Sequence, residues 1–285
     1  MKLMIAVPVY NRKKYLNTMV KSLKECDCIN EASIIVFNDC STEFDETYLK
    51  QVFKELNANV VTRLRNLRAD RNNYKIMLDF LNTNNDVLFI CDSDLLLRPD
   101  TLKFIQSDFE RTDGFLSVYN SDFHRDVYFD GEFVYKQDVG FAGICLSRDL
   151  VKSFVLKQKE TLRSVDFKLS SFLIKKGIRL MVPKNSYVQH IGFDGQNCNN
   201  KSVDFSSNFV PLSSFNKEII DEIMPIVLKR QAEMIQYLLF KDKYKRCGFM
   251  VHQPRKYFAQ NMLFKKLEKI YSTSYPINDK ERRYL

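Results

Sequence analysis

The segment Asp86-Val87-Leu88-Phe89-Ile90-Cys91-Asp92-Ser93-Asp94 joins a short apolar run to two closely spaced carboxylates. Its first six residues, Asp86–Cys91, have the pattern of a buried β-strand. Asp92 and Asp94 follow where that strand should end, with the apolar run Leu95–Leu97 behind them. Ligands of open α/β sheets bind outside the carboxyl ends of the strands, so this order predicts a polar site at a sheet edge.

Toward the N-terminus, short apolar strands alternate with amphipathic helices. The predicted strands are Leu3–Val9, Ser33–Phe37 and Asn59–Thr62, and the predicted helices are Arg12–Lys24, Asp45–Leu56 and Asn72–Leu81. With the strand at Asp86–Cys91, this alternation predicts an α/β fold in which helices cover both faces of a mostly parallel sheet.

Beyond Asp94 the strands become shorter and the helices fewer. We expect strands at Phe115–Tyr119, Val127–Phe129, Phe133–Tyr135, Phe141–Ser147 and Ile178–Val182, a hairpin turn at Asp130-Gly131, and a helix over Asp166–Lys176 that ends at Gly177. From about residue 212 the pattern is helical and basic. A helix over Lys217–Phe240 contains Pro225, where we expect a kink or a break.

Composition excludes several classes of protein. The chain has 285 residues, 45% hydrophobic and 28% charged, which suits one large globular domain or a domain with an appendage. Only 8 Gly and 7 Pro exclude a low-complexity or collagen-like chain. The apolar N-terminal run reaches Pro8 too soon for a signal peptide, and no stretch has the length of a membrane span, so the cytoplasm is the expected location.

Cysteine and charge give weaker information. The 7 cysteines are expected to be reduced, and Cys26 and Cys28 have no second pair nearby to complete a zinc site. The net charge is +9, and most of the excess lies after residue 217. A basic segment of this kind suits nucleic acid, an anionic membrane or an acidic partner, and charge alone does not choose among them.

Polar clusters follow three of the predicted strands, at Pro8–Arg12, Asn38–Thr42 and Asp92–Asp94. Two carboxylates as close as those of Asp92 and Asp94 raise each other's pKa unless a cation intervenes. Mg²⁺ or Mn²⁺ binds carboxylate and phosphate oxygens together and neutralises a departing diphosphate. The alternative is a solvated turn, for which Asp-Ser-Asp is a common composition, but its position after a strand favours a site.

About residues 1–195 resemble a family 2 glycosyltransferase of the GT-A fold. Ile5–Arg12 is similar to the opening strand and loop of that family, and Val36–Thr42 resembles its Val-x-Asp-Asp-Gly-Ser-Thr segment. Arg68–Asn72 resembles its Ala-x-Ala-Arg-Asn segment, and Asp92–Asp94 matches its metal-binding Asp-x-Asp. The resemblance implies a Rossmann-like catalytic domain over residues 1–210, with a nucleotide-sugar half at 1–97 and an acceptor half at 98–210, followed by a helical basic extension at 211–285.

The resemblance also implies an activity, the inverting transfer of a sugar from a nucleotide-sugar, with a UDP-sugar favoured, to a glycan, lipid-linked or protein-linked acceptor. The residues implied to border the donor are Pro8, Tyr10, Asn11, Arg12, Asp39, Arg71, Asp92 and Ser93. Asp39 would accept a hydrogen bond from the uracil N–H, and Asp94 would bind Mn²⁺ or Mg²⁺ together with Asp92. Two positions depart from the family pattern: Asn38 replaces an aspartate, which leaves the base open, and Cys40 replaces a glycine, which suggests different backbone angles in the turn.

Asp166 is the candidate catalytic base, because an inverting transfer needs a carboxylate to take the acceptor's proton and the family places an acid just before a helix here. The alternative is an ordinary helix N-terminal aspartate, and Asp122 and Asp126 are rivals. His190 lies in a segment that resembles the family's late Val-x-His, which implies a metal ligand rather than a core histidine. The glycines nearby, Gly192 and Gly195, indicate a close backbone approach, whereas His124 and His252 have no such context.

The basic C-terminal segment interleaves aromatic residues with lysine and arginine. It is read either as an amphipathic helix that makes peripheral contact with the inner face of a membrane, or as a segment that packs on the catalytic domain or on a second subunit, which we favour slightly. No nucleic-acid-binding motif is present, so nucleic acid is not expected as a partner.

Two other functions remain open. A sugar-nucleotide pyrophosphorylase usually needs a glycine-rich loop after the first strand, and Tyr10–Lys14 contains no glycine. A degenerate nucleotide-binding domain with a membrane- or partner-binding tail is supported by Asn38 and by the absence of a second acid beside Asp166. The sequence leaves open the donor sugar, the acceptor and the oligomeric state. A surface polysaccharide is among the candidate acceptors.

Overall fold

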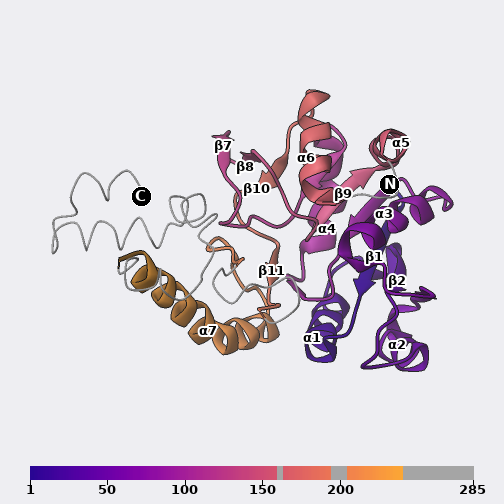
Figure 1. The fold of residues 1–285 in the computed structure, drawn as a ribbon, viewed down its shortest axis with the longest axis horizontal. Coiled ribbons are helices and arrows are strands. Elements are labelled where there is room, and N and C mark those ends of the chain that lie inside the picture. The colour runs from indigo at the N-terminus through magenta and orange to yellow at the C-terminus, as the bar shows by residue number, and fades with distance from the viewer. Residues whose placement is uncertain (159–162, 194–203, 240–285) are drawn as a thin grey trace.

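The computed structural model describes residues 1–158, 163–193 and 204–239, which form a layered α/β molecule with a long helix at the end of the last described range (Figure 1). The main sheet has the strand order β3-β2-β1-β4-β9-β6-β10-β8-β7. Its strands are β1 Leu3–Val9, β2 Ser33–Asn38, β3 Asn59–Thr62, β4 Val87–Ile90, β6 Phe115–Ser117, β7 Asp126–Phe129, β8 Phe133–Lys136, β9 Ile144–Ser147 and β10 Met181–Pro183. The helices are α1 Lys13–Lys24, α2 Glu46–Val52, α3 Arg68–Leu81, α4 Thr101–Asp108, α5 Arg148–Lys157, α6 Val165–Lys175 and α7 Ser214–Leu239.

The first four strands form the parallel half of the sheet. β1 pairs in parallel with both β2 and β4, and β2 pairs in parallel with β3. The register sets Val9 opposite Asn38 at the ends of β1 and β2, and it sets Ile90, the last residue of β4, opposite Ala6, so the ends of these three strands lie at one edge. The predicted α/β fold is confirmed, and the predicted convergence of the polar clusters follows from this register.

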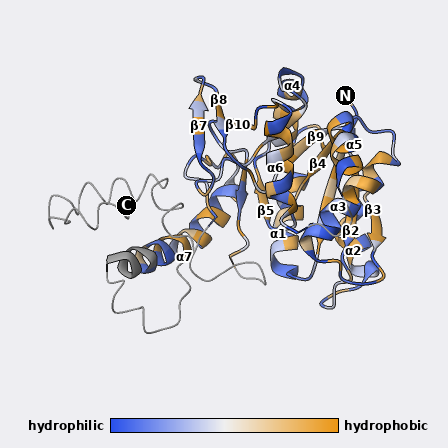
Figure 2. Ribbon diagram, turned by 45° about the horizontal axis from the view of Figure 1, so that its top comes forward, coloured by the Kyte–Doolittle hydropathy of each residue, from blue (hydrophilic) through white to orange (hydrophobic). Residues whose placement is uncertain are grey.

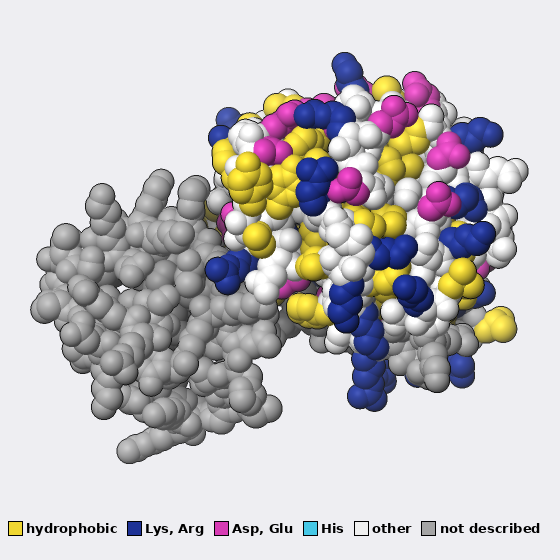
Figure 3. All heavy atoms as spheres, turned by 90° about the horizontal axis from the view of Figure 1, so that it is seen from above, with side chains coloured by type: hydrophobic (Ala, Val, Ile, Leu, Met, Phe, Trp, Pro, Cys, Tyr) yellow, Lys and Arg dark blue, Asp and Glu magenta, His cyan; other side chains and the backbone are white. Residues whose placement is uncertain are grey.

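The second half of the sheet is mixed. β9 runs antiparallel to both β4 and β6, β10 runs parallel to β6 and antiparallel to β8, and β7 and β8 form the predicted hairpin. At the outer edge, every residue of β7 is exposed. Its apolar side chains, Val127, Tyr128 and Phe129, are 66%, 62% and 46% exposed. Figure 3 shows a yellow hydrophobic patch toward the side of the molecule where Figure 1 places β7.

Side chains on both faces of the sheet are buried, as expected for central strands. Along β1, Leu3, Ile5 and Val7 pack into one core together with residues of α1, α2 and α4. Met4 and Ala6 point into the opposite core, which is completed by α3, α5 and α6. Figure 2 shows the resulting concentration of hydrophobic residues in the central strands. The expected coverage of both faces by helices is therefore confirmed.

Most predicted elements are present with shifted ends. α3 begins at Arg68, four residues before the predicted start at Asn72. The predicted helix over Asp45–Leu56 is divided at Phe53, where the backbone leaves the helical region and a short 3₁₀ turn, Lys54–Leu56, follows. Gly177 adopts a φ of 75° after α6, as its predicted role at the helix end requires.

A second, two-stranded sheet was not predicted. Leu95–Leu97 forms strand β5, which pairs antiparallel with β11, Val188–His190. The register sets His190 opposite Leu95, and the Ile191 amide donates to the Asp94 carbonyl at 2.9 Å. The small sheet therefore carries a histidine from late in the chain to the carboxylates that follow β4.

Helix α7 packs against this small sheet. Its buried residues Phe215, Ile219, Ile223 and Val227 form one cluster with Leu96, Ile191, Phe193 and Phe209. Of the kink or break expected at Pro225, the break does not occur, because the helix continues through this residue. Residues 240–285, which include most of the predicted basic and aromatic tail, lie outside the described residues. No helix in the described ranges is long and apolar enough to cross a bilayer.

Candidate functional site

Three elements bring charged side chains together around Asp94. Its carboxylate, only 6% exposed as a residue, follows β4. Arg12, from the loop after β1, places Nη1 2.6 Å from Asp94 Oδ2, and His190, from β11, places Nε2 3.2 Å from the same oxygen. The structure thus unites three of the residues that the sequence singled out from opposite ends of the domain.

Gly192 makes this arrangement possible. It is buried two residues after His190, and a Cβ added there would collide with Asp94 Oδ2 and with Arg12 Nη2. Only a residue without a side chain lets the backbone pass so close to the ion pair. The expectation of a close backbone approach is confirmed for Gly192, whereas Gly195 lies outside the described residues.

The charges in this cluster depend on one another. Burial alone would raise the pKa of Asp94, but His190 and Arg12 hold that pKa well below its ordinary value. Burial and repulsion from Asp94 raise the pKa of Asp92 to about 7. Burial would lower the pKa of His190, but the Asp94 carboxylate raises it to about 9. The nearby positive charges therefore keep Asp94 ionised. They do not offset the effects of burial and of the Asp94 charge on the Asp92 carboxyl, whose pKa stays raised.

Two nitrogens of the Arg12 guanidinium have no hydrogen-bond partner among the described residues. Its backbone and that of Asn11 both adopt the left-handed conformation, with φ of 65° and 54°, immediately before α1. The guanidinium lies 4.7 Å from the ring centre of Tyr15. Its Nε and Nη2 are buried without a hydrogen-bond partner in the described part of the chain. Because unpaired buried donors are costly, these two nitrogens suit a ligand that carries several acceptor oxygens.

The loop after β2 is held by side chains of both predicted motifs. Asn38 Oδ1 accepts from the Ser41 amide at 2.9 Å, and Asn11 Oδ1 accepts from the Thr42 amide at 2.7 Å. Cys40 has a φ of 62°, which is the left-handed region that glycine favours. A cysteine therefore adopts here a backbone conformation that glycine adopts without strain, and the expectation of different backbone angles in this turn stays a prediction.

Asp39 is 3% exposed and reaches the start of α3, where its Oδ1 accepts from the Leu67 amide at 2.8 Å. Burial raises the pKa of Asp39, although this hydrogen bond and one with the Arg68 amide oppose the increase. By contrast, Arg71 is exposed on the first turn of α3, and its side chain makes no hydrogen bond or ion pair with the described residues. The structure therefore joins Asp39, but not Arg71, to the loops around the site.

The remaining candidates for the donor site lie at the same strand ends. Pro8 belongs to β1, opposite Phe37, and Tyr10 follows that strand; both are partly exposed. Ser93, between the two carboxylates, is also partly exposed. All three are accessible to a ligand at the sheet edge.

Asp166 lies in the first turn of α6 and is partly buried. The start of this helix is bound by Asp70 of α3, whose carboxylate accepts from the Ser164 amide at 2.9 Å and the Val165 amide at 3.0 Å. Burial and repulsion from Asp70 raise the pKa of Asp166, and His124 opposes the increase. Because Asp39 contacts the residue before α3 and Asp70 links α3 to α6, Asp166 is tied to the same edge of the sheet.

The two rival acids have other contacts. Asp122 accepts from the backbone amide of Ser207 at 3.0 Å and from its hydroxyl at 3.1 Å. Asp126 lies on the exposed strand β7 and forms an ion pair with Lys136 at 2.6 Å. Both carboxylates are thus engaged within the acceptor half of the predicted domain.

One acidic residue near the site was not predicted. Asp204 accepts hydrogen bonds from the Tyr119 hydroxyl at 3.0 Å and from the Ser121 hydroxyl, and its charge helps to raise the pKa of His190. The isolated sequence Val203-Asp204-Phe205 contains no motif that would have identified it. His124 was likewise set aside, but its Nδ1 lies 2.5 Å from Asp138 Oδ1.

The cluster suits a divalent cation only if a ligand completes its coordination. No group of three or more His, Cys, Asp or Glu side chains in the described ranges is arranged to hold a metal ion. Asp94 and His190 offer an oxygen and a nitrogen, and His190 Nδ1 is buried without a partner in that part of the chain. Mg²⁺ and Mn²⁺ commonly take one or two protein ligands together with phosphate oxygens, so the residues present fit such a shared site.

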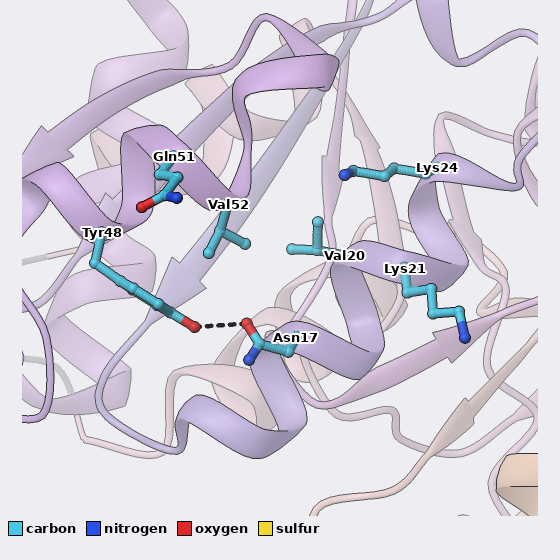
Figure 4. Close-up of a pocket in the computed structure, with 7 residues that line it drawn as sticks. All are labelled: Asn17, Val20, Lys21, Lys24, Tyr48, Gln51 and Val52. Carbon is cyan, nitrogen blue, oxygen red and sulfur yellow. Dashed lines mark hydrogen bonds between the residues drawn. The ribbon is translucent and has the colours of Figure 1, made fainter.

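A separate cavity of about 400 Å³ lies between α1 and α2 (Figure 4). The Tyr48 hydroxyl donates to Asn17 Oδ1 at 2.6 Å across it. The lining residues are Asn17, Val20, Lys21, Lys24, Tyr48, Gln51 and Val52. None of them is a predicted site residue, so this cavity is distinct from the edge at Asp94.

Comparison with known proteins identifies one family. The model of the family described as glycosyl transferase family 2 matches residues 4–172. Among curated proteins no match is found. Among solved structures, S. aureus TarS 1-349 in complex with UDP-GlcNAc shares 18% identity at a TM-score of 0.52, over 93% of this chain and 80% of that one.

A second similar structure is the mannosyltransferase PcManGT from Pyrobaculum calidifontis in complex with GDP-Man and Mn²⁺. It shares 13% identity at a TM-score of 0.51, over 99% of this chain and 82% of that one. At such low identity, the similarity to both structures shows a shared fold and does not identify a donor or an acceptor.

Proposed function

We propose, on the premise that the chain belongs to glycosyl transferase family 2, that it is a metal-dependent, inverting glycosyltransferase that takes a UDP-sugar as donor. The acceptor is a hydroxyl of a glycan, of a lipid-linked sugar or of a glycoprotein. The observation that carries the proposal is the buried Asp94 carboxylate, which Arg12 and His190 hold at the carboxyl ends of the parallel strands.

Arg12 and the acidic cluster would bind the diphosphate of the donor. Nε and Nη2 of Arg12, which have no partner within the described ranges, match phosphate oxygens, because these accept several hydrogen bonds. Asp94 and His190, with Asp92 beside them, would hold Mn²⁺ or Mg²⁺. The cation would neutralise the negative charge of the departing diphosphate. The similar structures are in complex with UDP-GlcNAc and with GDP-Man and Mn²⁺, which supports a nucleotide-sugar donor and a divalent cation for this chain as well.

Recognition of the base is assigned to Asp39. This buried carboxylate faces the loops at the ends of β2 and β3, where the resemblance implies the uracil. A carboxylate accepts a hydrogen bond from the imide N–H of uracil, and the corresponding edge of guanine presents N–H groups as well. For this reason the donor test compares UDP with GDP.

Deprotonation of the acceptor is assigned to Asp166. In an inverting transfer the acceptor oxygen attacks the anomeric carbon from the side opposite the diphosphate, and its proton passes to a nearby base. Asp166 is partly buried, and burial raises its pKa toward the range in which a carboxylate accepts a proton more readily. Its link to the donor edge through Asp70 and α3 supports this role.

The test is calorimetric titration of UDP, and of GDP in parallel, with Mn²⁺ and with EDTA. The proteins are the wild type, Asp94→Asn and Asp149→Asn, an exposed carboxylate in the first turn of α5 that serves as the matched control. We expect Mn²⁺-dependent binding of UDP by the wild type and the control, weakened about 10–100-fold in Asp94→Asn. Thermal melting shows whether each variant is folded.

Each outcome has a distinct meaning. Binding of GDP but not of UDP would indicate a GDP-sugar as the donor and would leave the proposed glycosyltransferase activity standing. Binding of neither nucleotide by folded wild-type protein in Mn²⁺ would contradict the proposal and favour a degenerate domain. If binding is established, release of UDP from a panel of UDP-sugars, with Asp166→Asn as the inactive comparison, tests the transfer itself.

A further inference from the structure

Helix α6 has apolar side chains on two sides, although only one side is buried. Val165, Leu169 and Leu173 pack into the core that α3 and α5 complete. On the outer side, Phe167 and Ile174 are 50% and 48% exposed. They are seven residues apart, close to two helical turns, so they share one face of the helix. Among the described residues, none buries this outer stripe.

Helix α5 lies beside α6 and extends the same surface. The rings of Phe154 in α5 and Phe172 in α6 meet edge-on, with their centres 5.4 Å apart. Lys157 Nζ lies 5.6 Å and Lys176 Nζ 5.3 Å from the centre of the Phe172 ring. The ends of both helices therefore place an ammonium group against one ring. Leu156, beside Lys157, is 76% exposed.

The charges of these two helices are unbalanced. Their acidic residues are Asp149 and Asp166 alone. Six exposed cations form no ion pair with a described acid: Lys152, Lys157, Arg163, Lys168, Lys175 and Lys176. We call these six residues, with Leu156, Phe167 and Ile174, the α5–α6 surface. Figure 1 places α5 and α6 on the upper side of the molecule, and Figure 3, which looks onto that side, shows Lys and Arg side chains interspersed with hydrophobic ones.

Lysines on the opposite face of the main sheet have acidic partners. Lys24 of α1 lies 2.9 Å from Glu55, and Lys50 of α2 lies 2.7 Å from Glu46. Both helices belong to the other core. The lysines of the α5–α6 surface have no such partner within the described ranges, so their positive charge is available to an external anion.

The positive charge disfavours two occupants that the protein itself could supply. The same surface of a second copy would bring identical cations, and like charges repel. Segment 240–285 is also rich in Lys and Arg. An anionic bilayer suits both properties of the surface, because lysines approach lipid phosphates while exposed apolar side chains enter the boundary between headgroups and acyl chains.

We propose that the α5–α6 surface binds the headgroups of an anionic lipid bilayer. The contact is peripheral and requires no nucleotide. It is distinct from the membrane contact expected for the basic tail, because all its residues lie between Lys152 and Lys176. One consequence rests on the proposed function. Asp166 directly precedes Phe167 on α6, so the assigned base would lie close to the headgroups, which favours a lipid-linked sugar among the acceptors.

The first test is flotation of the full chain, without nucleotide, with phosphatidylcholine vesicles that contain phosphatidylglycerol or lack it. We expect the wild type to bind the anionic vesicles only. The double variant Lys168→Gln/Lys175→Gln should bind them about 10–30-fold more weakly, because each Lys near an anionic surface contributes about fivefold. The matched control is Lys54→Gln/Lys103→Gln, which removes two exposed lysines from the opposite face and should bind like the wild type.

A second pair of variants tests the apolar part of the contact. Ile174→Ser should weaken binding to anionic vesicles about 3–10-fold, because a half-exposed isoleucine loses its burial in the bilayer. Ile226→Ser, at a residue of α7 that is 43% exposed, should leave binding unchanged. High salt should weaken binding of the wild type, since the charges are screened. Thermal melting shows whether each variant is folded.

Several outcomes would overturn the proposal. These are failure of the wild type to bind anionic vesicles, equal binding to vesicles without phosphatidylglycerol, and equal affinities of the two double variants. Retention of the wild type on single-stranded DNA or polyglutamate, without binding to vesicles, would also overturn it and would indicate an acidic macromolecule. Vesicle binding is measured without nucleotide, so these outcomes are distinguishable from a failure of the UDP titration that tests the proposed function.

Discussion

Gly192 is the residue on which the ion pair of Arg12 and Asp94 depends most directly. Any side chain there would occupy the space of the Asp94 carboxylate and the Arg12 guanidinium. We expect Gly192→Ala to lower the free energy of unfolding by about 1–3 kcal/mol, the usual cost of overpacking, and to abolish Mn²⁺-dependent nucleotide binding. Urea denaturation and calorimetry measure the two effects.

Gly140→Ala is the matched control for that substitution. The added Cβ at Gly140 meets no atom closer than 3.6 Å, and the backbone there does not have a positive φ. This variant should keep the affinity for nucleotide and most of its stability. Equal losses of nucleotide affinity in both variants would show that the close approach at Gly192 is not the cause.

The raised pKa of Asp122 predicts that the free energy of unfolding depends on pH. Burial raises its pKa from 3.8 to about 6 in the folded protein. Between these values the folded state retains a proton that the unfolded chain has released, so stability from this group is present at low pH and is lost as pH rises to about 6. The contribution changes by at most about 1.4 kcal/mol per pH unit.

The measurement compares urea denaturation of the wild type and Asp122→Asn at several pH values from 4 to 8. As pH rises from 4 to 6, the wild type should lose stability relative to the variant, and above pH 7 the difference should stay constant. A difference that does not vary with pH would show that Asp122 titrates normally in the folded protein.

At the scale of elements, helix α6 begins without a cap of its own. Ser164, at its start, adopts a φ of 53° and its side chain makes no capping hydrogen bond. The cap is supplied by Asp70 of α3, which accepts from the first two amides. This contact sets where α6 starts and therefore where Asp166 lies.

Asp70→Ala should therefore affect stability and turnover together. Loss of a helix cap costs about 1–2 kcal/mol, and a shifted first turn displaces Asp166. We expect a lower free energy of unfolding and a lower kcat, with nucleotide affinity retained because the Asp94 cluster is untouched. Asp149→Ala removes an acid from the first turn of α5, which Ser147 caps, and should change neither kcat nor nucleotide affinity.

At the scale of the whole molecule, helix α7 packs against the segment that follows His190. Its buried face packs on Ile191 and Phe193, which flank Gly192, and Arg230 Nη1 donates to the Phe193 carbonyl at 2.9 Å. The segment beside the Asp94 cluster and the first part of the predicted extension therefore share one core. Truncation of a buried side chain of α7 should therefore disturb the geometry of the Asp94 cluster.

Ile223→Ala tests this connection. Ile223 is 6% exposed, and truncation of a buried isoleucine costs about 2–4 kcal/mol. We expect that loss in urea denaturation together with weaker Mn²⁺-dependent nucleotide binding. Leu228→Ala, on the same helix but 50% exposed, should change neither quantity. A stability loss in Ile223→Ala with unchanged nucleotide affinity would show that α7 stabilises the fold without supporting the site.

Local sequence pattern determined much of this architecture. Continuous apolar runs such as Leu3–Val9 indicate buried strands, and apolar residues at a spacing of three or four indicate helices. The alternation of elements and the parallel half of the sheet could therefore be predicted. The position of Asp92 and Asp94 followed from the same pattern, because they stand directly after the strand that becomes β4. These features depend on residues that are neighbours along the chain.

Only the tertiary structure decided which side chains meet. Pairing of β5 with β11 brings His190 to Asp94, and the left-handed backbone at Arg12 aims its guanidinium at the same carboxylate. The contact of His124 with Asp138 and the capping of α6 by Asp70 arise in the same way. Each contact joins segments distant in sequence, and a hydrogen bond leaves no periodicity in the chain, so no local pattern carries the information.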